Sequence, residues 1–582
     1  MNDSSEAGRE ATSIGPEDDS PGIHDTASSI AGETVDQVGE STGQFPLPNQ
    51  SRAPEASTGR SAFLVGAGIL ISRIVGLIRQ RIFAHYFGTS AAGDAFSAAF
   101  RIPNFLQNVF GEGALSASFI PVYSKLLAQD NEEEAAHVAS SILALLALVT
   151  STIVLMGVLF TPYFIDVIAW GFKGETRELT IRLARILFPG AGLLVMSAWC
   201  LGVLNSHHRF FLSYTAPVVW NVAIIASLLM YGGQVSDSRL AEVAAWGSVI
   251  GSALQFGVQL PTVLRVVHRL RPVIDVVGAN ARTVMRNFLP VFVSRGVVQI
   301  SAFVDAGLAS LLPTGAVISL TYAQSLYTLP VSLFGMSVSA AELPAMSRAL
   351  GSTREIAEIL RHRLEDGLRR IAFFIVPSSM AFLALGDVIA AVLYQTGKFS
   401  HADANYVWAI LAGSTVGLLA STLGRLYSST YYALHDTRTP LRYAIVRVAL
   451  TTVLGYLCAI TLPPAIGLDP KWGVAGLTAS AGIAGWVEFS LLRRTLNLRI
   501  GRTGLVPSFV AKLWTAAAVG AMAGFALKLA LRPLHPIPMA LIVLGVYGVL
   551  YFAVAAAFGL PEAHSVLRRL WSLIDRRSKR HR

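Results

Sequence analysis

The stretch that decides the fold runs from residue 72 to residue 121. It reads S-R-I-V-G-L-I-R-Q-R (72–81), G-T-S-A-A-G-D (88–94), A-F-R-I-P-N-F-L (99–106) and F-G-E-G-A-L-S-A-S-F-I-P (110–121). Its apolar content predicts membrane helices, yet it carries the charged residues Arg73, Arg79, Arg81, Asp94, Arg101 and Glu112. A charge near the centre of a bilayer costs roughly 2.5–3.5 kcal/mol, so such side chains usually face a wet cavity, a partner or a substrate. The stretch therefore predicts that the first two membrane helices line a polar path.

The whole chain has the composition of a polytopic membrane protein. Of its 582 residues, 53% are hydrophobic and 14% are charged, which excludes an ordinary soluble domain. The net charge of +10 combines −8 in residues 1–60 with +18 in the remainder. On a membrane protein that surplus reflects topology first and argues little for nucleic-acid binding. Cys200 and Cys458 lie in separate apolar stretches, so we expect neither a disulfide framework nor a metal site.

Fourteen apolar segments are long enough to cross about 30 Å of hydrocarbon. We therefore predict an all-α polytopic membrane protein with about 14 transmembrane helices. Residues 1–60 are polar and acidic and predict a disordered cytoplasmic tail, and residues 561–582 predict a basic cytoplasmic tail. The predicted spans are 61–87, 94–124, 138–168, 176–204, 212–231, 239–267, 283–312, 315–346, 363–393, 402–430, 440–462, 472–494, 507–531 and 537–560.

The sequence also contains an internal repeat. The pair Ser72-Arg73 recurs as Ser294-Arg295, 222 residues later, and F-G-E-G-A-L-S-A-S-F-I-P-V-Y-S (110–124) is echoed by F-G-M-S-V-S-A-A-E-L-P-A-M-S (334–347). We expect two six-helix lobes in parallel repeat, at 61–275 and 276–500, followed by two additional helices within 501–560. Parallel repeats around a central site are typical of transporters. With both termini in the cytoplasm, most Lys and Arg residues fall on the inner side, as the positive-inside rule requires.

The charged residues of the predicted polar path suggest an anionic ligand. The planar guanidinium group is the usual partner of phosphate. The expected substrate-binding residues are Arg73, Arg79, Arg101 and Arg295. The acids expected to act as gating or charge partners are Asp94, Glu112, Asp305 and Glu342. Asp94 and Arg101 share one face of an ideal helix, where they either pair or both meet a polar lumen.

No motif for enzymatic chemistry stands out. The chain contains no G-x-x-x-x-G-K-[ST] loop, no nucleophile elbow and no H-E-x-x-H pattern. We therefore expect no enzyme, no catalytic residue, no metal and no cofactor. Transport would draw on an ion gradient, on the membrane potential or on the imbalance of the substrate itself.

Several motifs resemble the MurJ (MviN) family of lipid II flippases. They are S-R-x-x-G-x-x-R (72–79), D-A-F-x-x-A-F-R-I-P-N-x-L (94–106), F-x-E-G-A-x-S-x-x-F-I-P (110–121), G-K-F-S (397–400) and Y-A-L-H-D-T-R-T-P (432–440). The resemblance implies a MATE-like fold in the bacterial inner membrane. It also implies transfer of lipid II, an undecaprenyl-pyrophosphate-linked glycopeptide, to the periplasmic leaflet for peptidoglycan synthesis. Arg73, Arg79 and Asp94 match family positions regarded as functional.

The sequence departs from the family pattern at four positions. Where the family usually carries charged residues, this chain has Gln107, Gln324, Ser325 and Thr328. Three alternatives to lipid II transport therefore stay open. They are a diverged paralogue that flips another polyprenyl-pyrophosphate-linked glycan, a cation-coupled exporter of amphiphiles, and a non-transporting scaffold for cell-envelope synthesis.

Overall fold

The computed structural model describes residues 55–267, 270, 278–349, 351–531, 534–566 and 568. Residues 1–54 of the predicted acidic tail lie outside the described residues, and so does most of the predicted basic tail. Residues from Gly59 onward form one compact unit. Within the described ranges this unit contains helices and no strand, so the predicted all-α class is confirmed.

The elements follow one another along the chain with short connections. They are α1 (Glu55–Phe87), α2 (Ala91–Ala99), α3 (Arg101–Leu106), η1 (Gln107–Leu115), α4 (Ser116–Ala128), α5 (Glu132–Leu159), α6 (Thr161–Ile168), α7 (Gly174–Ser206), α8 (Phe210–Tyr231), α9 (Asp237–Val266), α10 (Ala279–Ser310), α11 (Ala316–Pro330), η2 (Val331–Met336), α12 (Ser337–Ser347), α13 (Thr353–Tyr394), α14 (His401–Ala433), α15 (Arg438–Tyr456), η3 (Leu457–Thr461), α16 (Leu462–Ala465), η4 (Pro470–Trp472), α17 (Gly473–Ile500), α18 (Pro507–Ala530) and α19 (Pro536–Ala557).

Every predicted span coincides with one helix or with a run of consecutive helical segments. Among the described residues, 11 helices are long and apolar enough to cross a membrane. The prediction of membrane-spanning helices is thereby confirmed, whereas the count of fourteen crossings stays a prediction. The long α13 begins ten residues before the predicted span, because Ser352 and Glu355 form a reciprocal capping box at its start.

The two copies of the sequence repeat share an unusual local structure. The first copy, 110–124, begins within the π-helix η1, and the second, 334–347, begins within the π-helix η2. A π-helix carries i→i+5 hydrogen bonds and is rare outside functional sites. The helix continues through Gly111 and Gly113 as a π-helix. The matching positions of the two π-helices support the internal repeat.

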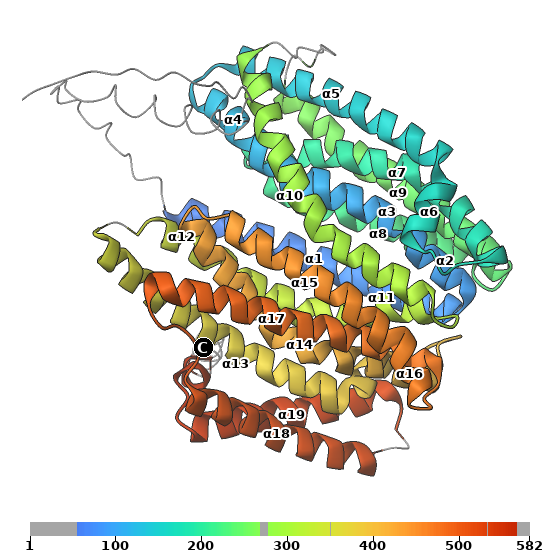
Figure 1. The fold of residues 1–582 in the computed structure, drawn as a ribbon. Coiled ribbons are helices and arrows are strands. Elements are labelled where there is room, and N and C mark those ends of the chain that lie inside the picture. The colour runs from blue at the N-terminus through green and yellow to red at the C-terminus, as the bar shows by residue number, and fades with distance from the viewer. Residues whose placement is uncertain are drawn as a thin grey trace, which may run out of the picture. The chain divides into compact units, whose positions relative to one another are not determined.

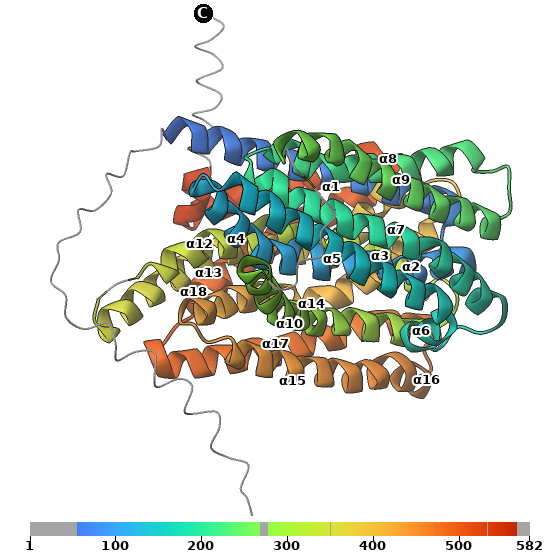
Figure 2. The ribbon, with the colours of Figure 1, turned by 90° about the horizontal axis from the view of Figure 1, so that it is seen from above.

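The helices form two groups that lie side by side (Figure 1). The first helix group consists of α2–α9, in which α7 packs against α5, α8 and α9. The second helix group consists of α11–α17, in which α14 packs against α13 and α17. Helices α18 and α19 pack on each other and on α13 (Figure 1). Figure 2 shows the bundle from above, with α15 and α17 on the side opposite to α8 and α9. The lobe boundaries at 275 and 500 stay predictions.

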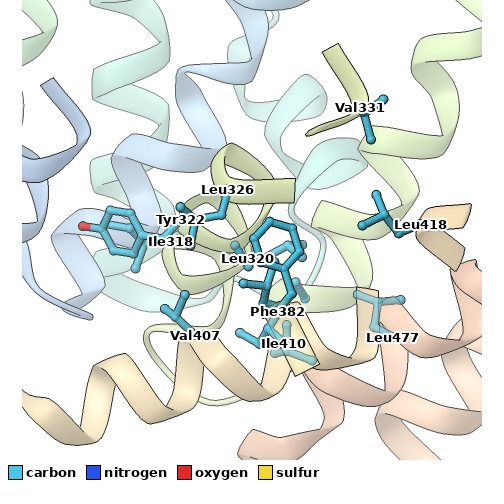
Figure 3. Close-up of a cluster of buried hydrophobic side chains, with 14 of the residues drawn as sticks. Ile318, Leu320, Tyr322, Leu326, Val331, Phe382, Val407, Ile410, Leu418 and Leu477 are labelled. Atoms are coloured by element: carbon cyan, nitrogen blue, oxygen red, sulfur yellow. The ribbon is translucent and has the colours of Figure 1, made fainter. Parts of the chain in front are cut away.

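Helix α11 is fixed by a buried apolar cluster in the second helix group. In Figure 3 its side chains meet those of α13, α14 and α17. Most of these side chains are completely buried, which fixes α11 tightly because protein interiors are close-packed. The face of α11 that carries Thr321, Gln324 and Thr328 is left free to line a cavity. The labelled members are Ile318, Leu320, Tyr322, Leu326, Val331, Phe382, Val407, Ile410, Leu418 and Leu477.

Helices α14 and α17 approach each other closely at two facing glycines, Gly417 and Gly482. A Cβ atom on Gly482 would lie 2.6 Å from the backbone nitrogen of Gly417, whereas a Cβ atom on Gly485 would meet nothing within 4 Å. Small residues let membrane helices approach closely. We expect Gly482→Ala to lower the free energy of unfolding by about 1–3 kcal/mol.

Thermal unfolding of the detergent-purified variants tests this prediction. Gly485→Ala is the matched control, because it makes the same change three residues later on the same helix. Equal unfolding temperatures for the two variants would show that the glycine contact does not set the helix separation.

Candidate functional site

Two connected chambers lie among the helices. The first, called here the arginine chamber, has a volume of about 540 Å³ and is lined by α1, α2, α3, η1, α10 and α11. The second, called here the side chamber, has a volume of about 740 Å³ and extends among α7, α8 and α9. The lining residues common to both chambers are Arg73, Arg79, Gln80, Asn104, Thr321, Gln324 and Thr328. The chambers therefore form one continuous cavity.

Arg79 is held over two aromatic rings. Its guanidinium carbon lies 5.1 Å from the ring centre of Phe100 and 5.5 Å from that of Trp220. The two rings stack on each other at 5.4 Å, and the indole N–H of Trp220 donates to Ser248. Cation–π contacts hold a guanidinium in place without neutralising its charge. Arg79 is thus positioned for a further, anionic partner.

The described lining of the cavity contains arginines but no acids. Neither chamber has an Asp or Glu among its described lining residues. Among the described side chains, no carboxylate forms an ion pair with Arg73 or Arg79. The charged residues of the described lining are consequently all cations, namely Arg73 and Arg79 of α1 and Arg101 of α3. An anion bound there would replace the missing carboxylates.

Arg101 of α3 lines the arginine chamber and contacts α10. Its Nη1 donates to the backbone oxygen of Ala302 at 2.8 Å, while its Nε is buried without a hydrogen-bond partner. Asp305 lies three residues beyond Ala302 on α10, and its Oδ1 is buried without a hydrogen-bond partner, but its charge interacts with those of Arg101 and Arg447. Arg101 therefore joins α3 to α10 and retains an unused donor.

Asp94 of α2 lies outside both chamber linings and caps α11. Its two carboxylate oxygens accept hydrogen bonds from the backbone N–H groups of Gly315 at 2.6 Å and Ile318 at 2.8 Å. A carboxylate at a helix N-terminus satisfies free N–H groups and interacts favourably with the helix dipole. Since Asp94 is only 3% exposed, this cap is buried. It ties the first helix group to the second.

Further polar contacts link α1 and the loop after it to α13 and α14 at the same end of the bundle. Arg81 donates from Nη1 to the backbone oxygens of Val392 at 2.8 Å and Leu393 at 2.9 Å, at the end of α13. The hydroxyl of Thr89 donates to Asp403 of α14 at 2.8 Å. Together with the cap on α11, these contacts hold α1, α11, α13 and α14 together at this end.

The remaining predicted site residues lie elsewhere or cannot be placed. Glu342 is buried at the far end of the second helix group, where it lies 3.4 Å from both Arg363 and Arg370 of α13. The backbone of Arg295 belongs to α10 and that of Glu112 to η1, but their side chains fall outside the described part of the structure.

The four departures from the family pattern lie at or next to the cavity. Gln324 and Thr328 line both chambers, and Gln107 lines the side chamber. Ser325 accepts a hydrogen bond from Gln80 at 3.3 Å. Neutral hydrogen-bonding groups thus stand where the family usually carries charges.

Sequence reasoning missed the uncharged polar part of the lining. Gln80 and Asn104 line both chambers, and Gln255 and Gln259 line the side chamber. A signal for the last two glutamines was present, because Ser248, Ser252, Gln255 and Gln259 recur with helical spacing within an apolar span.

Within the described ranges, no group of three or more His, Cys, Asp and Glu side chains is suited to hold a metal ion. The expected lack of a cofactor stays a prediction.

Comparison with known proteins gives consistent matches. A family profile described as "Lipid II flippase MurJ" matches residues 83–545. A curated relative from Rhizobium meliloti, "Probable lipid II flippase MurJ", is 30% identical over 455 residues, covering 75% of this chain and 80% of the relative.

Solved structures share the fold. The structure "Lipid II flippase MurJ, inward closed conformation" superposes with a TM-score of 0.71 at 24% identity, covering 85% of this chain and 98% of that one. An inward-facing multidrug resistance MATE family transporter of the MOP superfamily superposes with a TM-score of 0.60 at 17% identity, covering 73% and 95% of the respective chains. The predicted MATE-like fold is confirmed.

The cap on α11 can be tested by amide hydrogen exchange. Replacing Asp94 by Ala removes the acceptor of the Gly315 and Ile318 N–H groups. Because a hydrogen bond to a charged group contributes about 1.5–3 kcal/mol, we expect these amides to exchange about 10- to 100-fold faster. Asp166→Ala, which removes an exposed ion pair with Arg177, serves as the control. Unchanged exchange at 315 and 318 would contradict the cap.

Proposed function

Because the chain belongs to the lipid II flippase MurJ family, we propose that it transfers lipid II from the cytoplasmic to the periplasmic leaflet by alternating access. Lipid II is an undecaprenyl-pyrophosphate-linked glycopeptide, and its headgroup carries the diphosphate through a polar cavity while the tail stays in lipid. The observation that carries the proposal is the pair Arg73 and Arg79, which face a cavity whose described lining contains no Asp or Glu.

The diphosphate is the part of the substrate that fits the arginine chamber. A guanidinium group presents several N–H donors in a plane and binds phosphate oxygens through charge-assisted hydrogen bonds. Arg79 is oriented by Phe100 and Trp220, and Arg73 lies nearly two turns earlier on α1. Arg101 is a third cation at the chamber wall, and Asp305 offsets part of its charge. We expect Arg295 of α10 to add a fourth cation.

We propose that the Asp94 cap and the Arg81 contacts close the cavity at their end and that this closed end lies at the periplasm. The basic start of α13, with Arg361, Arg363 and Arg370, lies at the opposite end of that helix from Val392 and Leu393. The positive-inside rule assigns such a basic segment to the cytoplasm. Both termini then lie in the cytoplasm, and the cavity receives its substrate from the inner leaflet of the bacterial inner membrane.

Transport requires the closed end to open after the substrate has bound. The Asp94 cap and the Arg81 contacts stabilise the state seen here, so a bound headgroup must favour the alternative state by a comparable free energy. The energy source stays open between an ion gradient, the membrane potential and substrate imbalance. The lack of acids in the described lining disfavours a cation-coupled amphiphile exporter, which would bind its coupling ion and cationic cargo through carboxylates.

The direct test of function is depletion of the protein followed by leaflet-resolved measurement of lipid-linked precursors. We expect lipid II to accumulate in the inner leaflet as the protein is lost. Accumulation of a different polyprenyl-pyrophosphate-linked glycan would identify a diverged paralogue. An unchanged distribution would indicate a scaffold and would refute transport.

Arg79→Ala is the most informative single substitution. It removes the guanidinium held over Phe100 and Trp220, so we expect loss of complementation in a depletion strain while the protein still accumulates in the membrane. Arg177→Ala is the matched control, since Arg177 pairs with Asp166 on an exposed surface. Normal growth with Arg79→Ala would exclude this residue from the transport site.

A further inference from the structure

The turn between α13 and α14 carries the motif G-K-F-S (397–400). None of its four residues is among the described lining residues of either chamber. The turn lies at the same end of the bundle as the Asp94 cap, because the polar contacts of α1 and its following loop reach the helix ends on both sides of the turn. The motif must therefore act through its packing at this end rather than through the cavity.

One half of the motif is fixed in the second helix group. Phe399 is 1% exposed, and its ring centre lies 5.5 Å from that of Tyr322 on α11 and 5.9 Å from that of Tyr394 on α13. Ser400 caps α14 and forms a reciprocal capping box with Asp403. A buried aromatic ring and a capping box hold a segment in one conformation. The turn therefore moves together with the second helix group.

The other half of the motif contacts the end of α1. The backbone N–H of Lys398 donates to the backbone oxygen of His85 at 2.8 Å, and His85 Nδ1 lies 2.9 Å from the hydroxyl oxygen of Thr396. Gly397 has a φ of +54°, and a Cβ atom there would collide with the backbone oxygen of His85. Glycine lets the turn approach α1 this closely because it has no Cβ and adopts a positive φ without strain.

The same turn reaches the first helix group through an ion pair. Lys398 Nζ lies 2.5 Å from Asp237 Oδ1 at the start of α9, and both side chains are partly exposed. The end of α1 also packs on this group, because a Cβ atom on Gly232, between α8 and α9, would collide with the ring of Tyr86. The turn thus binds the first helix group directly through Lys398 and indirectly through the end of α1.

We propose that residues 396–400 form a clasp that holds the two helix groups together at this end and releases when they separate. This inference rests on the proposed function, because release belongs to the step in which the closed end of the cavity opens. The anchored side of the clasp is buried and apolar, whereas the side that binds α1 and α9 is polar and partly exposed. Water can replace polar partners when a contact breaks, so the polar side is the one that separates.

Distances between the helix groups test the clasp in the substrate-free protein. Spin labels at Lys173 and Ile466, exposed positions at this end of the first and second helix groups, report their separation by double electron–electron resonance in nanodiscs. Cys200→Ala and Cys458→Ala remove the free cysteines, so the labels attach only at the chosen positions. The unaltered clasp should give one predominant, short-distance population.

Gly397→Ala is the first test variant, and Gly174→Ala is its matched control. Both glycines have a φ of +54°, but a Cβ atom on Gly174 would meet nothing within 4 Å. The two substitutions therefore strain the backbone alike, and only the first forces the turn away from His85. We expect the ratio of long-distance to short-distance populations to rise about 5- to 100-fold in Gly397→Ala and to change less than about twofold in the control.

Lys398→Glu is the second test variant and leaves the backbone of the turn unchanged. It converts the attraction to Asp237 into repulsion, so we expect the same ratio to rise about two- to tenfold. Adding Asp237→Lys should restore the original distances, because it rebuilds the pair with its charges exchanged. Lys471→Glu is the matched control, since Lys471 lies 3.7 Å from Asp469 within the second helix group.

Unchanged distances in either test variant would refute the clasp. An equal shift in a test variant and its control would also refute it, as would failure of the charge exchange to restore the original distances. These measurements use no substrate, so a refuted clasp leaves the proposed function standing. Loss of the proposed function in the depletion test would, in turn, leave the measured distances unchanged.

Discussion

An arginine among membrane helices must satisfy its charge with a carboxylate, with water or with a ligand. In this protein Arg73 and Arg79 extend from α1 into a cavity whose described lining offers no carboxylate. Two stacked rings, Phe100 and Trp220, orient Arg79 and leave its charge uncompensated. Such an arrangement is unfavourable for an empty protein, and under the proposed function a bound diphosphate would compensate the charge. In the proposed transport cycle, the rest of the architecture keeps that positive cavity open at one end and sealed at the other.

The seal relies on backbone groups as much as on side-chain pairs. Asp94 caps the N-terminus of α11, and Arg81 binds the carbonyl end of α13. Both charges interact with the opposite partial charge of a helix terminus. When such a contact breaks, water hydrates the exposed helix terminus. No buried ion is then left unpaired on the partner helix, because that helix contributed backbone groups to the contact. This makes helix termini suitable partners for a contact that must open and close during transport.

The predictable part of the structure followed from apolar length and from the repeated motif. Segments such as 212–231 and 507–531 coincide with α8 and α18 nearly to the residue, because the spans are set by hydrocarbon thickness. Arg73 and Arg79 were predicted to face a polar path because a charge within an apolar helix needs a polar environment, and both do line the cavity. The partner of Asp94 could not be predicted in the same way, since backbone N–H groups 221 residues away carry no sequence signature. Gln255 and Gln259 were overlooked because neutral amides within an apolar span give a weaker signal than charges do.

The central claim is that the cavity arginines bind a diphosphate on a lipid. Native mass spectrometry of the purified wild-type protein, offered an equimolar mixture of undecaprenyl diphosphate and neutral undecaprenol, tests it most directly. We expect the diphosphate lipid to be retained selectively and added inorganic pyrophosphate to displace it. Equal retention of the two lipids, insensitive to pyrophosphate, would mean that the arginines do not recognise the headgroup and would contradict the account.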